Sequence, residues 1–383
     1  MSRPDDIFAL TGLQAPPLSG AKVRLNSTYG SPADYAQAID ELRAVFPPED
    51  VSTDPAVLDA HGRLAGYNES FPHSVVVVPR STEDVVRIVN ISRKYRVPVV
   101  AYGGGTSLEG HFYGTDAKGI CVDMSAMSKV LELHEADADL VCQAGAKWTD
   151  INAVLKEKGI PLFFPLDPAI GASIGGMIST GCSGTNAVRY GTAKGEWFLN
   201  ATVVLPSGEV IKTRRRSRKC SAGFDTLRLF LGAEGTLGIM TEVTIRLAPL
   251  LPTRVAVVQF PSVEHATRAS IEALNYGVNL QCIELLDALT MKTLNAYEAR
   301  TWPEKDSLFI KIQGATPAFI EESARILRAV AEKHGGTDFE FAATEAQAEE
   351  LWLARKNSFY AGYAMFPGAK AVETDVWSAS LSA

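Results

Sequence analysis

Three stretches of the sequence combine glycine with small hydroxyl residues, and this combination can bind an anion. They are GGGTSLEG at 103–110, AIGASIGGMISTGCSGTNAVRYG at 169–191 and GAEGTLGI at 232–239. Glycine adopts backbone conformations that other residues avoid, and it lets amide N–H groups approach a ligand with no Cβ in the way. Each stretch alone could be a tight turn without a ligand. Three of them within one region favour a shared anion site, and the first directly follows the apolar segment 97–102.

The best-defined nucleotide-site motifs do not occur in these stretches. The first stretch lacks the GxGxxG register of a Rossmann dinucleotide site, and the chain contains no GxxxxGK[ST] loop. Metal chemistry is not indicated either, because the six histidines show no ligand spacing. These histidines are His61, His73, His111, His134, His265 and His334.

Five longer segments stand out in this region: PRSTEDVVRIV (79–89), GGGTSLEGH (103–111), FFPLDPAIGASIGGMISTGCSGTNAVRYG (163–191), LPSGEVI (205–211) and SAGFDTLRLFLGAEGTLGIMTEVTIRL (221–247). Taken together, they resemble the FAD-binding domain of the vanillyl-alcohol-oxidase-type flavoproteins. The resemblance is dense from about residue 72 to residue 250. Within that family it is greatest to the D-lactate dehydrogenase (cytochrome) branch, with the glycolate oxidase FAD subunit and D-2-hydroxyglutarate dehydrogenase as near relatives.

The resemblance implies an FAD site built by the glycine-rich stretches. The first is expected to cradle the pyrophosphate, the second to line the isoalloxazine and its linker, and the third to contact the ribityl or adenine portion. Thr106 stands where some members carry a histidine that tethers the flavin, so non-covalent FAD is expected. His111 is interpreted as structural or as a residue that supports the site from behind its direct contacts, not as a tether. The expected FAD-binding residues are Gly103, Gly104, Gly105, Thr106, Ser107, Gly110, Pro168, Ala172, Ser173, Gly175, Gly176, Ser183, Gly184, Tyr190, Glu234, Gly235 and Ile239.

The fold class predicted is α+β. A PCMH-type (p-cresol methylhydroxylase-type) FAD-binding domain of two subdomains is followed by an incomplete ferredoxin-like α+β cap domain. The expected boundaries are 1–70 for an N-terminal extension and helical lead-in, 71–250 for the FAD-binding domain and 251–383 for the substrate or cap domain. Apolar runs predict strands at 73–79, 97–102 and 119–125, and in the cap at 253–260, 306–314, 338–343 and 370–376. Helical periodicity predicts helices at 262–277, 317–336 and 344–355.

The resemblance also implies a reaction: oxidation of a D-2-hydroxy acid, foremost D-lactate to pyruvate. The Cα hydride would pass to flavin N5, and the electrons to cytochrome c or another acceptor. Arg355, in LWLARKNSFY (351–360), matches a cap arginine that binds the substrate carboxylate in relatives. The alternative is a solvated helix arginine.

The general base is not found in this sequence. The family draws its base, and often a divalent metal site, from an HxGDGNxH-like segment, and nothing like it occurs here. The chain is therefore expected to be C-terminally truncated, with the base and the metal ligands beyond its end and with weak activity. The open alternatives are a D-2-hydroxyglutarate or glycolate dehydrogenase, an alkylglycerone-phosphate synthase, and a non-catalytic FAD-binding remnant. Glu373 aligns with a lysine of relatives that act on 2-hydroxyglutarate, which favours a monocarboxylate.

Composition restricts the partners and the location. The 383 residues carry a formal net charge of −7, which argues against general nucleic-acid binding. The basic run at 214–219 is interpreted as a solvated loop face. No stretch approaches the ~20 apolar residues of a membrane span, and the first residues form no presequence. The resemblance places the protein in mitochondria, with the cytoplasm as the alternative, and a homodimer is left open.

Overall fold

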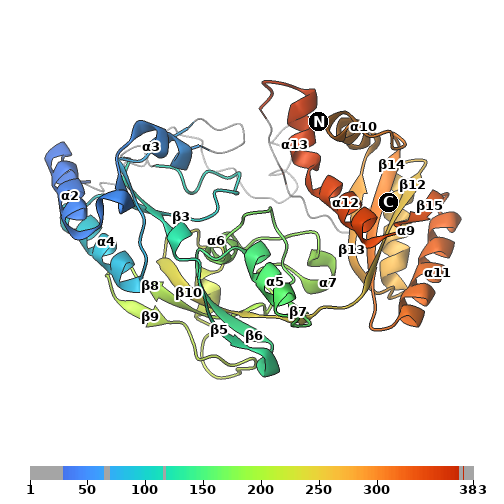
Figure 1. Cartoon of the computed structure of the whole chain (residues 1–383), viewed down its shortest axis with the longest axis horizontal. Coiled ribbons are helices and arrows are strands. Elements are labelled where there is room, and N and C mark those ends of the chain that lie inside the picture. The colour runs from blue at the N-terminus through green and yellow to red at the C-terminus, as the bar shows by residue number, and fades with distance from the viewer. Residues whose placement is uncertain (1–28, 64–69, 115–117, 371–373, 375–383) are drawn as a thin grey trace, which may run out of the picture.

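The computed structural model describes residues 29–63, 70–114, 118–370 and 374. Two parts stand side by side in Figure 1. The N-terminal part, from residue 29 to residue 249, contains a four-stranded sheet, a five-stranded sheet and a short two-stranded sheet. The C-terminal part, coloured orange to red, contains one sheet and its helices, and we call it the cap.

The first sheet has the strand order β1-β2-β4-β3, and both β2 and β3 pair with β4 in parallel. Three helices accompany it. The three strands predicted for this region are confirmed. A helix begins after Ser81, whose side chain caps the amide of Asp84. The elements are α2 (Pro32–Val45), η1 (Pro48–Asp50), β1 (Val51–Ser52), α3 (Pro55–His61), β2 (Val75–Val77), α4 (Thr82–Tyr95), β3 (Val99–Tyr102), β4 (Ile120–Asp123) and η2 (Met124–Ala126).

The second sheet is antiparallel, with the order β5-β6-β10-β8-β9. It shares one hydrophobic core with the first sheet, since Ile120 of β4 and Val243 of β10 belong to the same buried cluster. The two-subdomain prediction is thereby confirmed. The elements are β5 (Val130–His134), η3 (Glu135–Asp137), β6 (Asp139–Gln143), α5 (Trp148–Glu157), β7 (Leu162–Phe163), α6 (Ile174–Thr180), α7 (Ala187–Tyr190), β8 (Phe198–Val204), β9 (Val210–Lys212), α8 (Leu227–Phe230), β10 (Ile239–Arg246) and β11 (Ala248–Pro249).

The cap sheet has the order β13-β14-β12-β15, with every neighbouring pair antiparallel. This is the ferredoxin-like βαββαβ arrangement. The elements are β12 (Thr253–Phe260), α9 (Val263–Asn275), β13 (Leu280–Leu286), α10 (Ala288–Glu298), β14 (Asp306–Gln313), α11 (Pro317–Lys333), β15 (Thr337–Phe341), α12 (Glu345–Lys356) and α13 (Ser358–Met365).

The cap contains a strand and a helix that the sequence did not predict. Strand β13 and helix α10 were not predicted, because Gln281 and Glu284 interrupt the apolar pattern of β13. With β13 in place, the described strands follow the full βαββαβ order. Most of the strand predicted at 370–376 lies outside the described residues.

The two faces of the cap sheet differ in chemistry, because side chains alternate along a strand. On β14, Leu308, Ile310 and Ile312 pack against α9 and α11. On the other face, Phe309 packs with α10 and α12 residues, and Lys311 and Gln313 follow it toward the N-terminal part. This second face is the one that can meet a ligand held by the N-terminal part.

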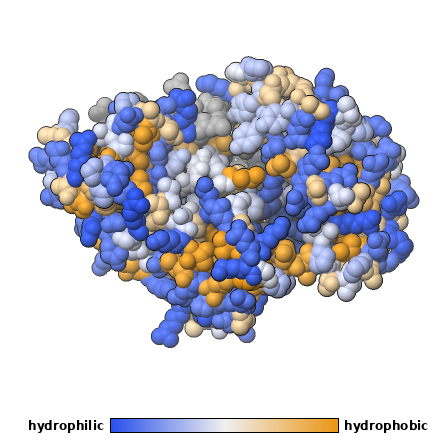
Figure 2. Space-filling view, in the orientation of Figure 1, coloured by the Kyte–Doolittle hydropathy of each residue, from blue (hydrophilic) through white to orange (hydrophobic). Residues whose placement is uncertain are grey.

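The surface facing the viewer in Figure 2 is mainly hydrophilic, with hydrophobic residues in smaller patches. Among the described residues, none of the helices combines the length and hydropathy that crossing a membrane requires.

Candidate functional site

A cavity of about 220 Å³ lies between the four-stranded and the five-stranded sheet of the N-terminal part. Ala101 of β3 lines one side and Ile239 of β10 the other. The predicted residues that line it are Gly103, Gly104, Gly105, Thr106, Ser107, Pro168, Ala172, Ser173, Gly175, Gly176, Glu234, Gly235 and Ile239.

The loop that follows β3 offers backbone donors to this cavity. Within the described part of the chain, no amide N–H from Gly103 to Ser107 has a hydrogen-bond acceptor. Gly104 is exposed and the other four residues are half-buried, so these unpaired amides are open to a ligand that accepts hydrogen bonds. Gly105 has φ +62°, a conformation that favours glycine. The loop fits an anionic group such as a pyrophosphate.

The second glycine-rich stretch is held against this loop. A Cβ on Gly103 would lie 2.4 Å from Ser173 Oγ, and one on Gly104 would lie 2.2 Å from the carbonyl oxygen of Gly171. Ser173 caps α6, its Oγ accepting from the amide of Gly176 at 3.3 Å. The amide of Gly175 donates to the carbonyl of Ala144 at 2.7 Å. In this second stretch and at Gly103 and Gly104, glycine allows the two loops to lie close together. The unpaired amide donors belong to the first loop.

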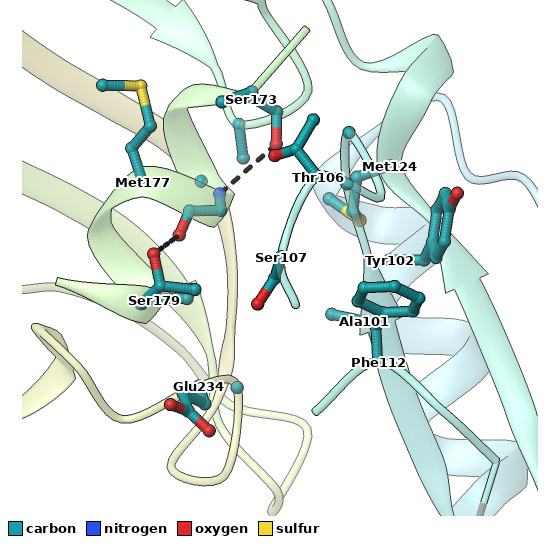
Figure 3. A pocket seen from close by; sticks show the side chains of 18 of the residues that line it. Ala101, Tyr102, Thr106, Ser107, Phe112, Met124, Ser173, Met177, Ser179 and Glu234 are labelled. Carbon is teal, nitrogen blue, oxygen red and sulfur yellow. Dashed lines mark hydrogen bonds between the residues drawn. The ribbon is translucent and has the colours of Figure 1, made fainter. Parts of the chain in front are cut away.

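The third stretch closes the far side of the cavity. The amide of Glu234 donates to the carbonyl of Ser179 at 2.8 Å, which ties this loop to α6. Gly235 has φ +78°, and the nearest atom to a Cβ there would be Ala101 Cβ at 4.0 Å. Figure 3 shows Ser107 and Glu234 on opposite sides of open space, with Tyr102 and Phe112 along one wall.

Four of the predicted FAD-binding residues do not line the cavity: Gly110, Ser183, Gly184 and Tyr190. Their contact with FAD stays a prediction. A Cβ on Gly184 would lie 2.6 Å from Asp167 Oδ1, so this glycine allows a close contact with a carboxylate. The hydroxyl of Tyr190 donates to Gln313 Oε1 of the cap at 2.9 Å. Both belong to the contact between the two parts of the chain.

Several lining residues were not predicted. His111, interpreted from sequence as structural, lines the cavity, and its Nδ1 lies 3.3 Å from Ser107 Oγ. Burial lowers the pKa of His111, and the carboxylates of Glu234 and Glu109 oppose this shift. Other unpredicted lining residues include Tyr102, Phe112, Met124, Met177, Ser179 and Thr180. All of these except Met124 lie within or next to a glycine-rich stretch in the sequence, and this position could have indicated them.

The contact between the cap and the N-terminal part is polar and buried. Asp167 accepts from the amide of Asn186 at 2.8 Å, and Lys356 Nζ lies 3.2 Å from its Oδ2. The side chain of Asn186 in turn accepts from Gln281 Nε2 at 3.1 Å. The SGTN segment is therefore fixed between both parts, which positions the cap over the N-terminal part.

Arg355 lies on α12 at this contact, in an ion pair. Its Nη2 is 2.5 Å from Glu284 Oε2, while its buried Nε has no hydrogen-bond partner among the described residues. Burial raises the pKa of Glu284, and Arg355 partly opposes that shift. Nearby, Lys311 Nζ stacks 4.4 Å from the Trp352 ring centre, and burial lowers its pKa. Two partly buried cations thus face the N-terminal part.

His61 supports the wall of the cavity from behind. Its Nε2 lies 3.1 Å from Asp123 Oδ2, and its ring packs 4.5 Å from that of Tyr102. The hydrogen bond to Asp123 raises the pKa of His61 against the opposing effect of burial. A histidine whose folded-state pKa is raised stabilises the fold fully below its unfolded pKa, and this stabilisation is lost as the pH rises through the folded value.

We therefore expect His61→Asn to lower the free energy of unfolding by about 1 kcal/mol near pH 6 and by less near pH 9. Chemical denaturation of the wild type and the variant at both pH values measures this difference. Burial lowers the pKa of His73 and the charge of His61 lowers it further, so a smaller part of the pH dependence comes from the changed titration of His73. A deficit that grows with pH would contradict the assigned role of the His61–Asp123 pair.

Among the described residues, no group of three or more His, Cys, Asp or Glu side chains could hold a metal ion.

Comparison with known proteins assigns the family. Residues 72–214 match the FAD binding domain model, and residues 252–378 match the model of the C-terminal domain of FAD linked oxidases. The probable mitochondrial D-lactate dehydrogenase of Danio rerio is 36% identical over 374 residues, which cover 97% of this chain and 74% of that protein. The chain belongs to the FAD-linked oxidase family. FAD is accordingly its cofactor, as the resemblance implied.

Other FAD-linked oxidases extend this comparison. The mitochondrial D-lactate dehydrogenase [cytochrome] of Arabidopsis thaliana is 44% identical over 303 residues, or 79% of this chain. The chain spans 53% of that relative's length. The truncation expected from sequence is not supported by these comparisons.

Two solved structures share the fold. The 4-ethylphenol oxidase of Gulosibacter chungangensis superposes with a TM-score of 0.73 at 21% identity, covering 90% of this chain and 75% of that one. An alkyldihydroxyacetonephosphate synthase superposes with a TM-score of 0.70 at 20% identity, covering 92% and 72%. Identities this low show the fold alone. The predicted PCMH-type fold is confirmed.

Proposed function

We propose that this FAD-linked oxidase oxidises a D-2-hydroxy acid, with D-lactate as the substrate and pyruvate as the product. The observation that carries the proposal is the pair of partly buried cations, Arg355 and Lys311, on the cap face toward the FAD-binding part. A small carboxylate is the ligand such cations favour. Relatives named as D-lactate dehydrogenases, at 36–44% identity, support the same substrate.

The cavity residues would hold FAD without a covalent bond, since Thr106 occupies the tether position. The free amides from Gly103 to Ser107 would bind the pyrophosphate. Pro168, Ala172, Ser173, Gly175 and Gly176 would lie along the isoalloxazine, and Glu234, Gly235 and Ile239 along the ribityl or adenine portion. FAD, when bound, supplies the two-electron acceptor that the side chains lack.

Arg355 would bind the substrate carboxylate through the part of its guanidinium that Glu284 does not occupy. Its unpaired buried Nε supports this role. Lys311 would add a second positive charge, which keeps the carboxylate ionised and attracts monocarboxylates into the contact between the two parts. We assign no general base. Glu373, which favoured a monocarboxylate, lies outside the described residues.

The remaining proposals follow from the names of relatives and from the fold. Cytochrome c, or another acceptor, would take the electrons, and the mitochondrion would be the location. The FAD-binding domain would span 71–250 and the cap 251–383, after the extension and lead-in at 1–70. A homodimer is compatible with these proposals.

A dye-linked assay tests the substrate. We expect the FAD-loaded protein to reduce the dye with D-lactate and to show at most about a hundredth of that kcat/KM with L-lactate or D-2-hydroxyglutarate, a difference of about 3 kcal/mol. Faster turnover of D-2-hydroxyglutarate or glycolate would assign one of the sister activities instead. FAD retention with no turnover of any 2-hydroxy acid would favour the non-catalytic remnant.

A further inference from the structure

A second cavity lies at the opposite end of β10 from the first. Ile239, at the start of this eight-residue strand, lines the FAD cavity, and Arg246, at its end, lines the second cavity. At ~3.4 Å per residue the two ends are about 24 Å apart. The second cavity measures about 880 Å³, counting the space open to solvent. It is therefore separate from the site described above.

Cations dominate the lining of this second cavity. They come from three places: the basic run at 214–219, the short helix α8 and the end of β10. The acidic groups are fewer, Glu196 and Asp225, and Asp225 Oδ2 is already 3.3 Å from Arg228 Nε. The lining cations are Arg214, Arg218, Lys219, Arg228 and Arg246.

Arg246 gives the cavity a feature that a solvated loop face lacks. Its guanidinium stacks 5.2 Å from the Trp197 ring centre, and its buried Nε has no hydrogen-bond partner among the described residues. No carboxylate in the described part of the chain forms an ion pair with it. Burial lowers the pKa of Arg246, as does the charge of Arg218, while Glu196 opposes the shift. A partly buried guanidinium without a counter-ion is costly, and an anionic ligand would relieve that cost.

Backbone carbonyls hold two of the other guanidinium groups in place. Arg214 Nε donates to the carbonyl of Leu199, and Arg228 Nη1 donates to that of Lys194 at 3.0 Å. Their planar forks are thus positioned before any ligand arrives, which lowers the entropy cost of binding.

We propose that this second cavity is a binding site for a phosphate group. Arginine forks match phosphate oxygens in pairs, and five cations against two carboxylates favour a group with more than one negative charge. A free phosphate-bearing molecule and the headgroup of an anionic phospholipid present the same chemistry. The basic run at 214–219, interpreted from sequence as a solvated loop face, is in part the wall of this site.

Titration of the FAD-loaded full chain with inorganic pyrophosphate tests the site, because bound FAD keeps the probe out of the first cavity. We expect Arg218→Gln to weaken binding about tenfold, the loss of one charge-assisted contact. The matched control is Arg215→Gln, which removes the same charge from the same run but does not line the cavity, and it should bind within twofold of wild type. Arg246→Lys keeps the charge but loses the fork and should also weaken binding.

Sedimentation with phosphatidylcholine vesicles containing phosphatidylglycerol distinguishes a free phosphate compound from a phospholipid headgroup as the ligand. Pyrophosphate binding without vesicle binding identifies a free phosphate compound. Vesicle binding that Arg218→Gln loses and Arg215→Gln keeps identifies a lipid headgroup. The proposal is overturned if neither probe binds, or if Arg218→Gln and Arg215→Gln weaken binding equally. Flavin content, unchanged in every variant, verifies that the fold is intact.

Discussion

Gly104→Ala is expected to remove FAD from the protein. The new Cβ would lie 2.2 Å from the carbonyl oxygen of Gly171 and 3.3 Å from Ala172 Cα. Backbone atoms cannot yield as a side chain can, so the loop after β3 must move away from the second glycine-rich stretch. That movement misplaces the free amides from Gly103 to Ser107. Losing two charge-assisted hydrogen bonds, each of about 1.5–3 kcal/mol, would raise the dissociation constant for FAD at least a hundredfold.

The measurement is the ratio of flavin to protein absorbance after gel filtration, with circular dichroism to verify folding. Gly362→Ala is the matched control. It lies in α13, a Cβ there would meet no atom within 4 Å, and its flavin content should equal that of wild type. A folded Gly104→Ala protein with full flavin content would show that the loop after β3 is not the pyrophosphate cradle.

Arg355→Leu is expected to reduce both substrate use and stability. Removing the fork should lower kcat/KM for D-lactate at least a hundredfold, a loss of about 3 kcal/mol. It also leaves Glu284 as a buried carboxylate without its cation. Breaking a fully buried ion pair costs about 3–5 kcal/mol, and because these side chains are 23% and 22% exposed we expect about 2 kcal/mol.

The stability loss should depend on pH in a defined direction. Without Arg355 the pKa of Glu284 rises further, so the folded variant binds a proton that the unfolded chain does not hold at the same pH. Its deficit in unfolding free energy should therefore be smaller near pH 5 than near pH 8. Denaturant titrations at both pH values measure it.

Two control variants separate the role of Arg355 in substrate binding from its role in stability. The double variant Arg355→Leu/Glu284→Gln should recover most of the stability but none of the turnover, because it removes the unpaired charge without restoring the fork. Arg325→Leu breaks a pair with Glu322 whose side chains are 69% and 58% exposed, and it should leave the stability almost unchanged because solvent screens such a pair. Wild-type turnover by Arg355→Leu would contradict the proposed carboxylate contact.

The sequence predicted those parts of the site that lie close together along the chain. The loop from Gly103 to Ser107 follows its strand directly, and Ser173 caps the helix that it begins, so local pattern and resemblance sufficed. The wall formed by Tyr102 and Phe112 was missed, although it continues the same segment, because an aromatic residue beside a strand is also typical of a core.

Contacts between distant segments could not be predicted in this way. Tyr190 was assigned to FAD, but its hydroxyl bonds to Gln313, which is 123 residues away. Strand β13 was missed because the same contact between the two parts makes one of its faces polar. The second cavity joins Arg218 to Arg246, and no local pattern links a basic loop to the end of a later strand.

An anaerobic absorbance spectrum, recorded before and after D-lactate is added, tests the central claim most directly. The protein should show the visible bands of oxidised flavin, and these bands should bleach when D-lactate reduces the flavin. L-lactate should leave them unchanged, and dithionite should bleach them fully and report the flavin content. A flavin spectrum that D-lactate leaves unchanged while dithionite bleaches it would contradict the proposed oxidation of D-2-hydroxy acids by this chain.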